Sequence, residues 1–242
     1  MFNHRKKFYI KIAIFTENQI PDFKSADYAI SQSHINYLDR HFTYQNSFFN
    51  KLLLFNKYNK KARNEVLKNP IRKKFCAAVI SNYWHTDNFR INFINELSKY
   101  KIVDMGGKYK NNVGKIQNKI EFLSSYKFSI AMENTEGDGY ISEKIIDSFL
   151  SGTIPIYYGS YMVEEFINPK SFILIKGEKD ILQKIEYIIK IDNDEQIYRN
   201  IIKESILIDQ NILKKYKKEY EEFLFHIFEQ EKKRAKRIDY VI

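Results

Sequence analysis

Residues 126–160 place the tightest constraint on how this chain can fold. The run Lys127–Met132 is apolar, rich in β-forming residues and long enough for a buried strand. A polar loop with two glycines follows at 133–139, and glycine, asparagine and aspartate all tolerate positive φ. Apolar residues at helical spacing come next, beginning after the candidate N-cap Ser142, and 153–158 is a second strand. The stretch therefore predicts a right-handed parallel crossover, with a ligand-binding loop at the carboxyl ends of its strands.

The loop and the first helical turn gather four side chains that suit a nucleotide: Asn134, Tyr140, Glu143 and Lys144. Backbone N–H groups at a helix start attract a phosphate, and a lysine there adds a full positive charge. A carboxylate can accept two hydrogen bonds from a ribose diol. Successive helical residues point about 100° apart, so Glu143 and Lys144 can serve different parts of one nucleotide. From the pattern alone, an ordinary solvated helix start explains these two charges equally well.

The same stretch resembles the donor-binding motif of the α-1,3/1,4-fucosyltransferases of glycosyltransferase family 10, particularly their bacterial members. The matching segments are Met-Glu-Asn at 132–134, Tyr-Ile-Ser-Glu-Lys at 140–144, Ile-Pro-Ile-Tyr-Tyr-Gly-Ser at 154–160 and Asn-Pro-Lys-Ser-Phe at 168–172. A match this long and ordered is more specific than a single glycine motif. The resemblance implies that Lys144 binds the diphosphate of GDP-fucose. It also implies that Asn134, Tyr140 and Glu143 hold the nucleoside and the fucose.

A second resemblance lies near the amino terminus, where a strand predicted over residues 8–15 runs directly into Thr-Glu-Asn. The family has a similar passage, T-G-E-N followed by D-Y-A-[IL]. Here the glycine is missing, but Asp-Tyr-Ala-Ile is present at 27–30. The matching glutamate is the family's proposed general base, so the resemblance implies that Glu17 takes this role. Considered alone, Glu17 is an exposed loop carboxylate.

Arg90 is a further donor-binding candidate, at the start of a helix predicted over 88–99. In the family, an arginine in the matching N-x-x-x-R-x-x-F passage binds the donor diphosphate. A guanidinium fork fits two phosphate oxygens, so the role is chemically sensible. The alternative is a surface arginine near a helix start, where the helix dipole slightly disfavours a cation.

The composition sets broader bounds. The chain has 242 residues, 44% of them hydrophobic and 16% aromatic, which predicts a globular protein with a proper core. Its net charge of +10 favours anionic partners, although a lysine-rich and asparagine-rich composition explains the charge as well. Basic and aromatic residues are not arranged as in a nucleic-acid module, so no nucleic acid partner is expected. The single cysteine, Cys76, excludes an internal disulfide and a cysteine zinc site, which fits a reducing cytosol.

No segment approaches the roughly 20 apolar residues of a membrane span, and Lys11 interrupts the apolar stretch near the amino terminus. We therefore expect a cytoplasmic protein. A long helix is predicted over 211–237, ending in the basic cluster 232–237. Bacterial relatives often carry a basic amphipathic tail held to attach them to the inner membrane surface, so the resemblance allows a peripheral contact with an anionic membrane. A solvated helix that packs back on the body is the plainer alternative.

The predicted architecture is α/β and GT-B-like, with three parts. Residues 1–70 form a reduced amino-terminal acceptor-side lobe and linker, 71–204 a complete Rossmann-like donor lobe, and 205–242 a basic amphipathic helix. The family has several strand–helix units before its T-G-E-N passage, and this chain starts almost at that point. Within the first part, residues 42–70 are expected to be irregular, with one weak helix near 60–67.

The function implied by the resemblance is an inverting transfer of L-fucose from GDP-fucose to a hydroxyl of N-acetylglucosamine or glucose. The acceptor would be an N-acetyllactosamine-like glycan, and the linkage α-1,3 or α-1,4. No Asp-x-Asp motif or histidine cluster is present, so no obligatory metal cofactor is expected. Two alternatives stay open: a truncated, non-catalytic remnant that binds GDP-sugar only, and a basic membrane or nucleic-acid adaptor.

Overall fold

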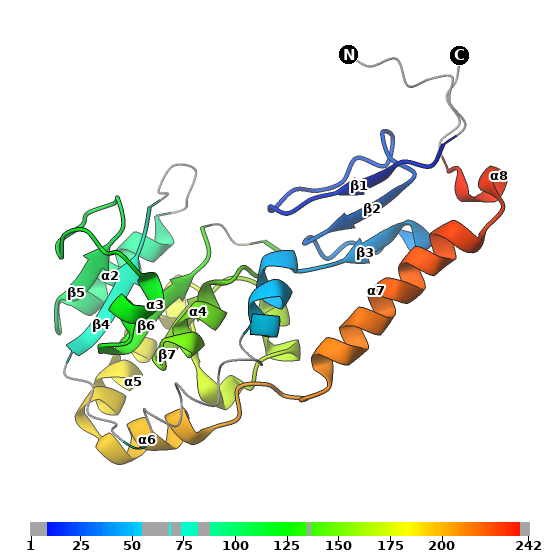
Figure 1. The fold of residues 1–242 in the computed structure, drawn as a ribbon. Coiled ribbons are helices and arrows are strands. Elements are labelled where there is room, and N and C mark those ends of the chain that lie inside the picture. The colour runs from blue at the N-terminus through cyan, green and yellow to red at the C-terminus, as the bar shows by residue number, and fades with distance from the viewer. Residues whose placement is uncertain (1–8, 55–67, 69–73, 82–87, 135–136, 238–242) are drawn as a thin grey trace.

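The structure is a computed structural model that describes residues 9–54, 68, 74–81, 88–134 and 137–237. It consists of two lobes that lie side by side, each built on its own parallel sheet (Figure 1). The amino-terminal sheet has the order β1-β2-β3, and the carboxy-terminal sheet has the order β5-β4-β6-β7-β8. All the pairings within both sheets are parallel. The predicted α/β fold is therefore confirmed.

The elements alternate along the chain as expected for parallel sheets. The strands are β1 Ile12–Ile14, β2 Tyr28–Ser31, β3 His41–Thr43, β4 Lys74–Val79, β5 Val103–Gly106, β6 Tyr126–Met132, β7 Ile154–Tyr158 and β8 Ile173–Leu174. The α-helices are α2 Phe89–Ser98, α3 Lys119–Leu123, α4 Lys144–Leu150, α5 Ile181–Asn193, α6 Glu195–Lys203, α7 Ile212–Glu229 and α8 Lys232–Ala235, and a further helix covers residues 46–54. Short 3-10 helices are η1 Leu38–Arg40, η2 Tyr161–Glu165, η3 Pro169–Ser171 and η4 Glu178–Asp180.

The larger sheet is buried on both faces because neighbouring residues of a strand point to opposite sides. In β7, Ile156 packs in a cluster with residues of α2 and α5, whereas Tyr157 packs in the cluster of α4. This arrangement explains why β7 reads as a continuous apolar run with no polar face. The crossover predicted from residues 126–160 is present: β6 leads through α4 to β7, and the two strands pair in parallel.

The prediction that residues 42–70 are irregular is wrong for the part that the structure describes. Residues 46–54 form a helix, and Phe48, Phe49 and Leu52 are buried against the α4 face of the larger sheet. These apolar residues lie at helical spacing, but the surrounding lysines and asparagines concealed the pattern. The weak helix expected near 60–67 lies outside the described residues.

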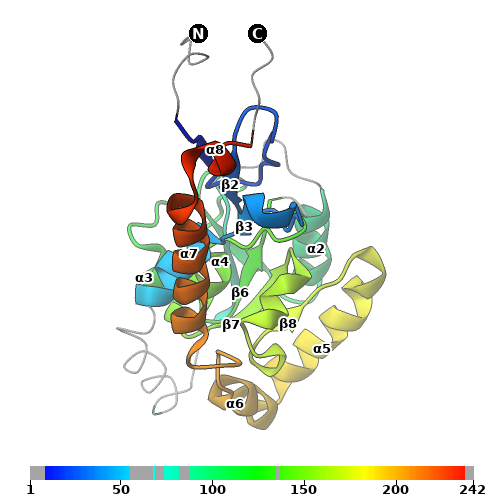
Figure 2. The same ribbon diagram turned by 90° about the vertical axis from the view of Figure 1, so that its right-hand side faces the viewer.

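The carboxy-terminal helix is not continuous to residue 237. α7 ends at Glu229, the next two residues are extended with ψ of 149° and 134°, and α8 is a separate short turn. Figure 2 shows α7 lying along the amino-terminal sheet beside β3. Phe42 of β3 packs on Tyr216, Tyr220 and Phe223 of α7, with ring centroids 5.9, 5.7 and 5.5 Å apart. The apolar stripe of α7 thus covers the small sheet.

The break after α7 brings the end of the described chain against the start of β2 in the same sheet. The backbone N–H of Arg237 donates to Oδ1 of Asp27 at 2.8 Å, and its guanidinium donates to the Tyr28 hydroxyl at 3.1 Å and to Asp39. Ala235 is completely buried. Burial and hydrogen bonding therefore favour the bend over one straight, solvated helix. No helix among the described residues is long and apolar enough to cross a membrane.

Candidate functional site

The two lobes meet at a loop of the larger sheet, residues 137–139, which follows β6. The backbone N–H of His34 donates to the Asp138 carbonyl at 2.9 Å, and the Gln45 side chain donates to the Gly139 carbonyl at 3.2 Å. His34 and Gln45 come shortly after β2 and β3, so the carboxyl ends of the small sheet face the loop. Ligands of parallel sheets bind at the carboxyl ends of their strands, which makes this junction the candidate site.

Glycine makes the contact between the lobes possible. Gly139 has a φ of +89°, and a Cβ there would lie 2.4 Å from the Gln32 carbonyl oxygen and 2.6 Å from the His34 nitrogen. A Cβ on Gly137 would lie 2.5 Å from the side chain of Asn18, the residue after Glu17. Only glycine allows the backbone to approach so closely at positive φ. The loop is therefore shaped to hold the Glu17–Asn18 segment against the larger lobe.

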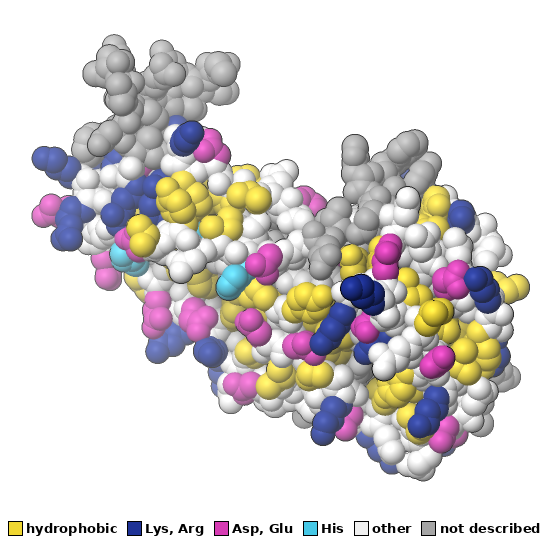
Figure 3. Space-filling view, turned by 180° about the vertical axis from the view of Figure 1, so that it is seen from behind, with side chains coloured by type: hydrophobic (Ala, Val, Ile, Leu, Met, Phe, Trp, Pro, Cys, Tyr) yellow, Lys and Arg dark blue, Asp and Glu magenta, His cyan; other side chains and the backbone are white. Residues whose placement is uncertain are grey.

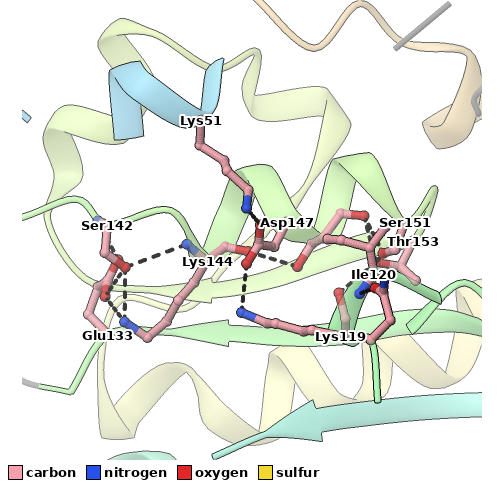
Figure 4. A network of polar contacts seen from close by, with 12 residues as sticks. Lys51, Lys119, Ile120, Glu133, Ser142, Lys144, Asp147, Ser151 and Thr153 are labelled. Carbon is pink, nitrogen blue, oxygen red and sulfur yellow. Dashed lines mark hydrogen bonds and ion pairs between the residues drawn. The ribbon is translucent and has the colours of Figure 1, made fainter. Parts of the chain in front are cut away.

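A buried polar cluster lies beside the loop, formed by Glu133, Ser142 and Lys144 (Figure 4). Glu133 directly follows β6, and its side chain is completely buried. Its Oε1 accepts from the Ser142 backbone N–H at 2.8 Å, and its Oε2 accepts from the Lys144 ammonium at 2.6 Å. The Ser142 hydroxyl lies 2.8 Å from both carboxylate oxygens and accepts from the Lys144 ammonium at 2.9 Å. Lys144 is thus held at the edge of the site with 21% of its side chain exposed.

Ser142, the predicted N-cap, lies one residue before the N-cap position of α4, although its hydroxyl accepts from the Lys144 backbone N–H at 3.5 Å. α4 begins at Lys144, and its N-cap position, Glu143, makes no side-chain cap bond. Ser142 lies one residue earlier, where both its N–H and its hydroxyl bind the Glu133 carboxylate. A buried carboxylate needs charge-assisted donors, and Ser142 and Lys144 supply them to Glu133.

Arg90 is buried, with only 3% of its surface exposed, so it is not a surface arginine. Its Nη1 donates to Oδ1 of Asn134 at 2.8 Å, which links α2 to the loop after β6. The preceding residue, Phe89, stacks on Tyr158 of β7 with ring centroids 4.1 Å apart. This stacking holds the first turn of α2 in place. The hydrogen bond between Arg90 and Asn134 brings two of the predicted donor-binding residues together.

Tyr140 lies at the centre of the acidic side chains of the site. It is 8% exposed, and burial is the main cause that raises the pKa of its hydroxyl above the usual value. The carboxylates of Glu133, Glu17 and Glu143 add to this rise in pKa, in that order. The hydroxyl therefore stays protonated at neutral pH and can donate a hydrogen bond. The loop after β1 reaches the same site, since the side chain of Asn18, the residue after Glu17, lies against Gly137.

The structure thus places all six predicted site residues around one junction, with Glu17 exposed on the small lobe and Glu143 half-buried. Glu133 is a site residue that the sequence reasoning did not assign, although it was part of the Met-Glu-Asn match. The sequence does contain a sign of this role, because Glu133 directly follows an apolar strand and so lies at the carboxyl end where ligands bind. Among the described residues, no group of three or more His, Cys, Asp or Glu side chains is arranged to hold a metal ion.

Comparison with known proteins agrees with this geometry. The model of glycosyltransferase family 10 (fucosyltransferase), C-terminal part, matches residues 69–223, well over half of the chain. The chain belongs to glycosyltransferase family 10. The matched region contains β4 to α6, most of α7 and five of the six candidate residues. Glu17 lies outside it.

The most similar relatives include an alpha-(1,3)-fucosyltransferase of Helicobacter pylori, 39% identical over 139 residues. That alignment spans 57% of this chain and 29% of the relative. The human 4-galactosyl-N-acetylglucosaminide 3-alpha-L-fucosyltransferase 9 is 28% identical over 131 residues, which span 53% of this chain and 36% of that protein. The chain therefore matches only about a third of the length of these curated family members.

Solved structures resemble the chain over a larger share. A crystal structure of alpha1,3-fucosyltransferase with GDP-fucose has a TM-score of 0.77 at 28% identity, covering 90% of this chain and 76% of that one. The same kind of enzyme with GDP has a TM-score of 0.74 and covers 88% of this chain. The likeness includes most of both lobes, which confirms the GT-B-like expectation.

The close approach at Gly139 generates a prediction. Gly139→Ala should lower the free energy of unfolding by roughly 2–4 kcal/mol, because a β-carbon at positive φ is strained and the new methyl also meets two backbone atoms. Gly114→Ala is the matched control, since Gly114 has a similar φ of +81° and nothing within 4 Å of the added carbon. Urea unfolding of both variants measures the difference. Equal losses in the two variants would mean that contact between the lobes does not constrain the loop.

Proposed function

We propose that this member of family 10 transfers L-fucose from GDP-fucose to a sugar hydroxyl, with inversion at the anomeric carbon. The observation that carries the proposal is the meeting of Lys144, Arg90 and Tyr140 at the junction that Glu17 also reaches. A nucleoside diphosphate-sugar needs positive groups for its phosphates and polar groups for its sugars, and these residues supply both. The likeness to alpha1,3-fucosyltransferases crystallised with GDP-fucose and with GDP supports the same donor.

In this proposal, the lysine and the arginine share the diphosphate. The Lys144 ammonium binds as a point charge, while the Arg90 guanidinium offers a planar fork and is already oriented by Asn134. Glu143 is half-buried beside Lys144 and accepts hydrogen bonds from the hydroxyls of the ribose. Tyr140 and Asn134 contact the nucleoside and the fucose. The positive groups stabilise the negative charge that develops on the departing GDP.

Glu17 takes the proton in the chemical step. The acceptor oxygen attacks the anomeric carbon from the face opposite to GDP, the bond from that carbon to the phosphate oxygen breaks, and the acceptor proton moves to the Glu17 carboxylate. Glu17 suits this role because it is exposed on the small lobe, across from the donor-binding residues. A base on the small lobe can meet an acceptor that arrives from solvent while the large lobe holds the donor.

The names of the relatives suggest a particular acceptor. One relative is named for transfer to the 3-position of a 4-galactosyl-N-acetylglucosaminide, and another is an alpha-(1,3)-fucosyltransferase. We therefore place an N-acetyllactosamine-like glycan first, with N-acetylglucosamine or glucose as the accepting sugar and an α-1,3 linkage ahead of α-1,4. A panel of such acceptors, with linkage determined by NMR, tests this choice.

One observation favours a second candidate, a non-catalytic protein that binds GDP-sugar only. The amino-terminal sheet has three strands among the described residues, against five in the donor lobe. A small acceptor lobe offers less surface to position an acceptor. Product formation from GDP-fucose separates the two candidates, since a remnant binds the donor without turnover.

The carboxy-terminal segment carries the proposed contact with an anionic membrane surface at the cytoplasmic face. Lys232, Lys233 and Arg234 are exposed on α8. Figure 3 shows basic side chains gathered over this end of the molecule, whereas charges of both signs are mixed over the donor lobe. Each basic residue near an anionic surface contributes about 1 kcal/mol at low salt. Arg237 differs from these three residues, because its bonds are made within the small lobe.

This difference separates surface binding from stability. Replacing Lys232, Lys233 and Arg234 together by alanine should weaken binding to vesicles of one-third phosphatidylserine by about 3 kcal/mol while stability is retained. Arg237→Ala should instead lower the free energy of unfolding by about 1 kcal/mol. Sedimentation with vesicles at low and high salt, together with urea unfolding, measures both effects. Vesicle binding that survives the triple substitution would contradict the proposal.

The donor site has a direct test in Lys144. Lys144→Ala should weaken GDP binding by about 1.5–3 kcal/mol, because a charged hydrogen bond to phosphate is lost. Isothermal titration calorimetry with GDP measures the change. Lys190→Ala is the control, since Lys190 is exposed on α5 and lies outside every segment that matches the donor-binding motif. A Lys144→Ala variant that is folded and binds GDP like the parent would rule out this role.

The base has a separate test. Glu17→Gln should lower fucose transfer by about 10²–10⁴-fold, the usual contribution of a general base, while GDP affinity stays within about twofold. Transfer is followed with GDP-fucose and N-acetyllactosamine, and GDP affinity by calorimetry. Glu195→Gln, a change of an exposed residue at the start of α6, is the control. Equal rates in the parent and in Glu17→Gln would assign the base to another residue.

A further inference from the structure

We propose that Glu133 is a positioning residue that holds Lys144 and directs its ammonium toward the donor diphosphate. The inference rests on the proposed function in taking the donor to be a nucleoside diphosphate. Glu133 itself touches no donor, because its carboxylate is completely buried beneath Lys144 and Ser142. Its effect on the reaction would therefore pass through Lys144.

The count of donors and acceptors supports this role. A lysine ammonium has three N–H groups. Among the described residues, one of these groups binds Oε2 of Glu133 at 2.6 Å and a second binds the Ser142 hydroxyl at 2.9 Å. One N–H is left for a ligand, and the two fixed bonds set its direction. Without them, the four-carbon side chain would lose more rotamer entropy on binding a phosphate.

The carboxylate is itself locked in place. The backbone N–H of Glu133 donates to the Tyr158 carbonyl at 2.8 Å, which continues the pairing of β6 with β7. On the other side, a Cβ on Gly159 would lie only 2.8 Å from Cγ of Glu133, so the side chain fills the space that this glycine leaves. The position of the Lys144 ammonium is thus set by the sheet through one side chain.

The pairing also affects the charge of the site. The Glu133 carboxylate balances the Lys144 ammonium, so the pair adds no net charge to the donor site. Lys144 then acts chiefly through the direction of its N–H. Both carboxylate oxygens of Glu133 are needed, because a glutamine has a single amide oxygen and cannot accept from the Ser142 N–H and the Lys144 ammonium through separate oxygens.

A double-mutant cycle with GDP tests the inference. Glu133→Gln should weaken GDP binding at least tenfold in the parent and change it less than twofold in the Lys144→Ala background, because its effect requires Lys144. The matched control is Asp192→Asn. Asp192 is also a buried carboxylate paired with lysines, at 2.6 Å to Lys101 and 2.8 Å to Lys127, but it lies on α5 away from the junction. This control should lower stability and leave GDP affinity within twofold of the parent.

A second measurement needs no ligand. Acetylation of Lys144 by an N-hydroxysuccinimide ester, read by mass spectrometry of its peptide, should be at least threefold faster in Glu133→Gln than in the parent. Asp192→Asn should leave this rate unchanged. If Glu133→Gln fails to fold, Glu133→Asp keeps the charge but withdraws it by one methylene, and the same increase in Lys144 acetylation is expected.

The outcomes separate this inference from the proposed function. Tighter GDP binding by Glu133→Gln, or an equal loss in the parent and in the Lys144→Ala background, would overturn the positioning role. Unchanged acetylation of Lys144 would overturn it as well. If the parent protein binds no GDP, the proposed function is wrong. The acetylation rate of Lys144 would then decide by itself whether Glu133 holds Lys144.

Discussion

The approach of Gly139 to the backbone after β2 is the contact on which the rest of the site depends. It sets the distance between the two sheets, because a carbonyl oxygen and an amide nitrogen lie where a side chain would otherwise begin. The hydrogen bonds of His34 and Gln45 then hold the loop on the small lobe. Since Glu17 is carried by that lobe and Lys144 by the other, their separation follows from this approach and from the hydrogen bonds that hold it. Catalysis by two opposed groups requires such a fixed separation.

Within the donor lobe, the sheet and α4 fix the positions of the charged groups. Two carboxylates near the start of α4, Glu133 after β6 and Asp147 in the first turn of the helix, show how charge is buried in this protein. Glu133 binds Lys144, and Asp147, 4% exposed on α4, binds Lys51 at 3.0 Å and Lys119 at 2.8 Å (Figure 4). Both carboxylates are paired with lysines, as buried charges must be. The ion pair of Lys144 lies beside the loop at the junction, so one kind of pairing stabilises the start of α4 at Asp147 and positions a candidate binding residue at Lys144.

Much of the donor lobe was predictable from the sequence because its signals are local. Apolar runs bounded by glycine gave β6, α4 and β7 to within about two residues, and the order of motifs in 126–160 indicated the family. The helix over 46–54 was missed because its partners, α4 and Phe166, are distant in sequence. The role of Glu133 was missed for a related reason. Nothing in a Met-Glu-Asn tripeptide shows that the glutamate is buried, or that its partners lie nine and eleven residues later.

The packing of the carboxy-terminal segment also depends on partners that are distant in sequence. This packing explains how a small amino-terminal sheet can be stable. Three parallel strands cannot bury both faces alone, because parallel sheets need a covering layer. That layer is α7, whose aromatic side chains pack on β3 and whose Tyr216 hydroxyl donates to Gln45 at 3.0 Å. Gln45 in turn holds the Gly139 carbonyl. A continuous chain of contacts thus runs from a helix near the end of the sequence to the loop of the candidate site. The helix α7 therefore takes part in positioning the donor loop.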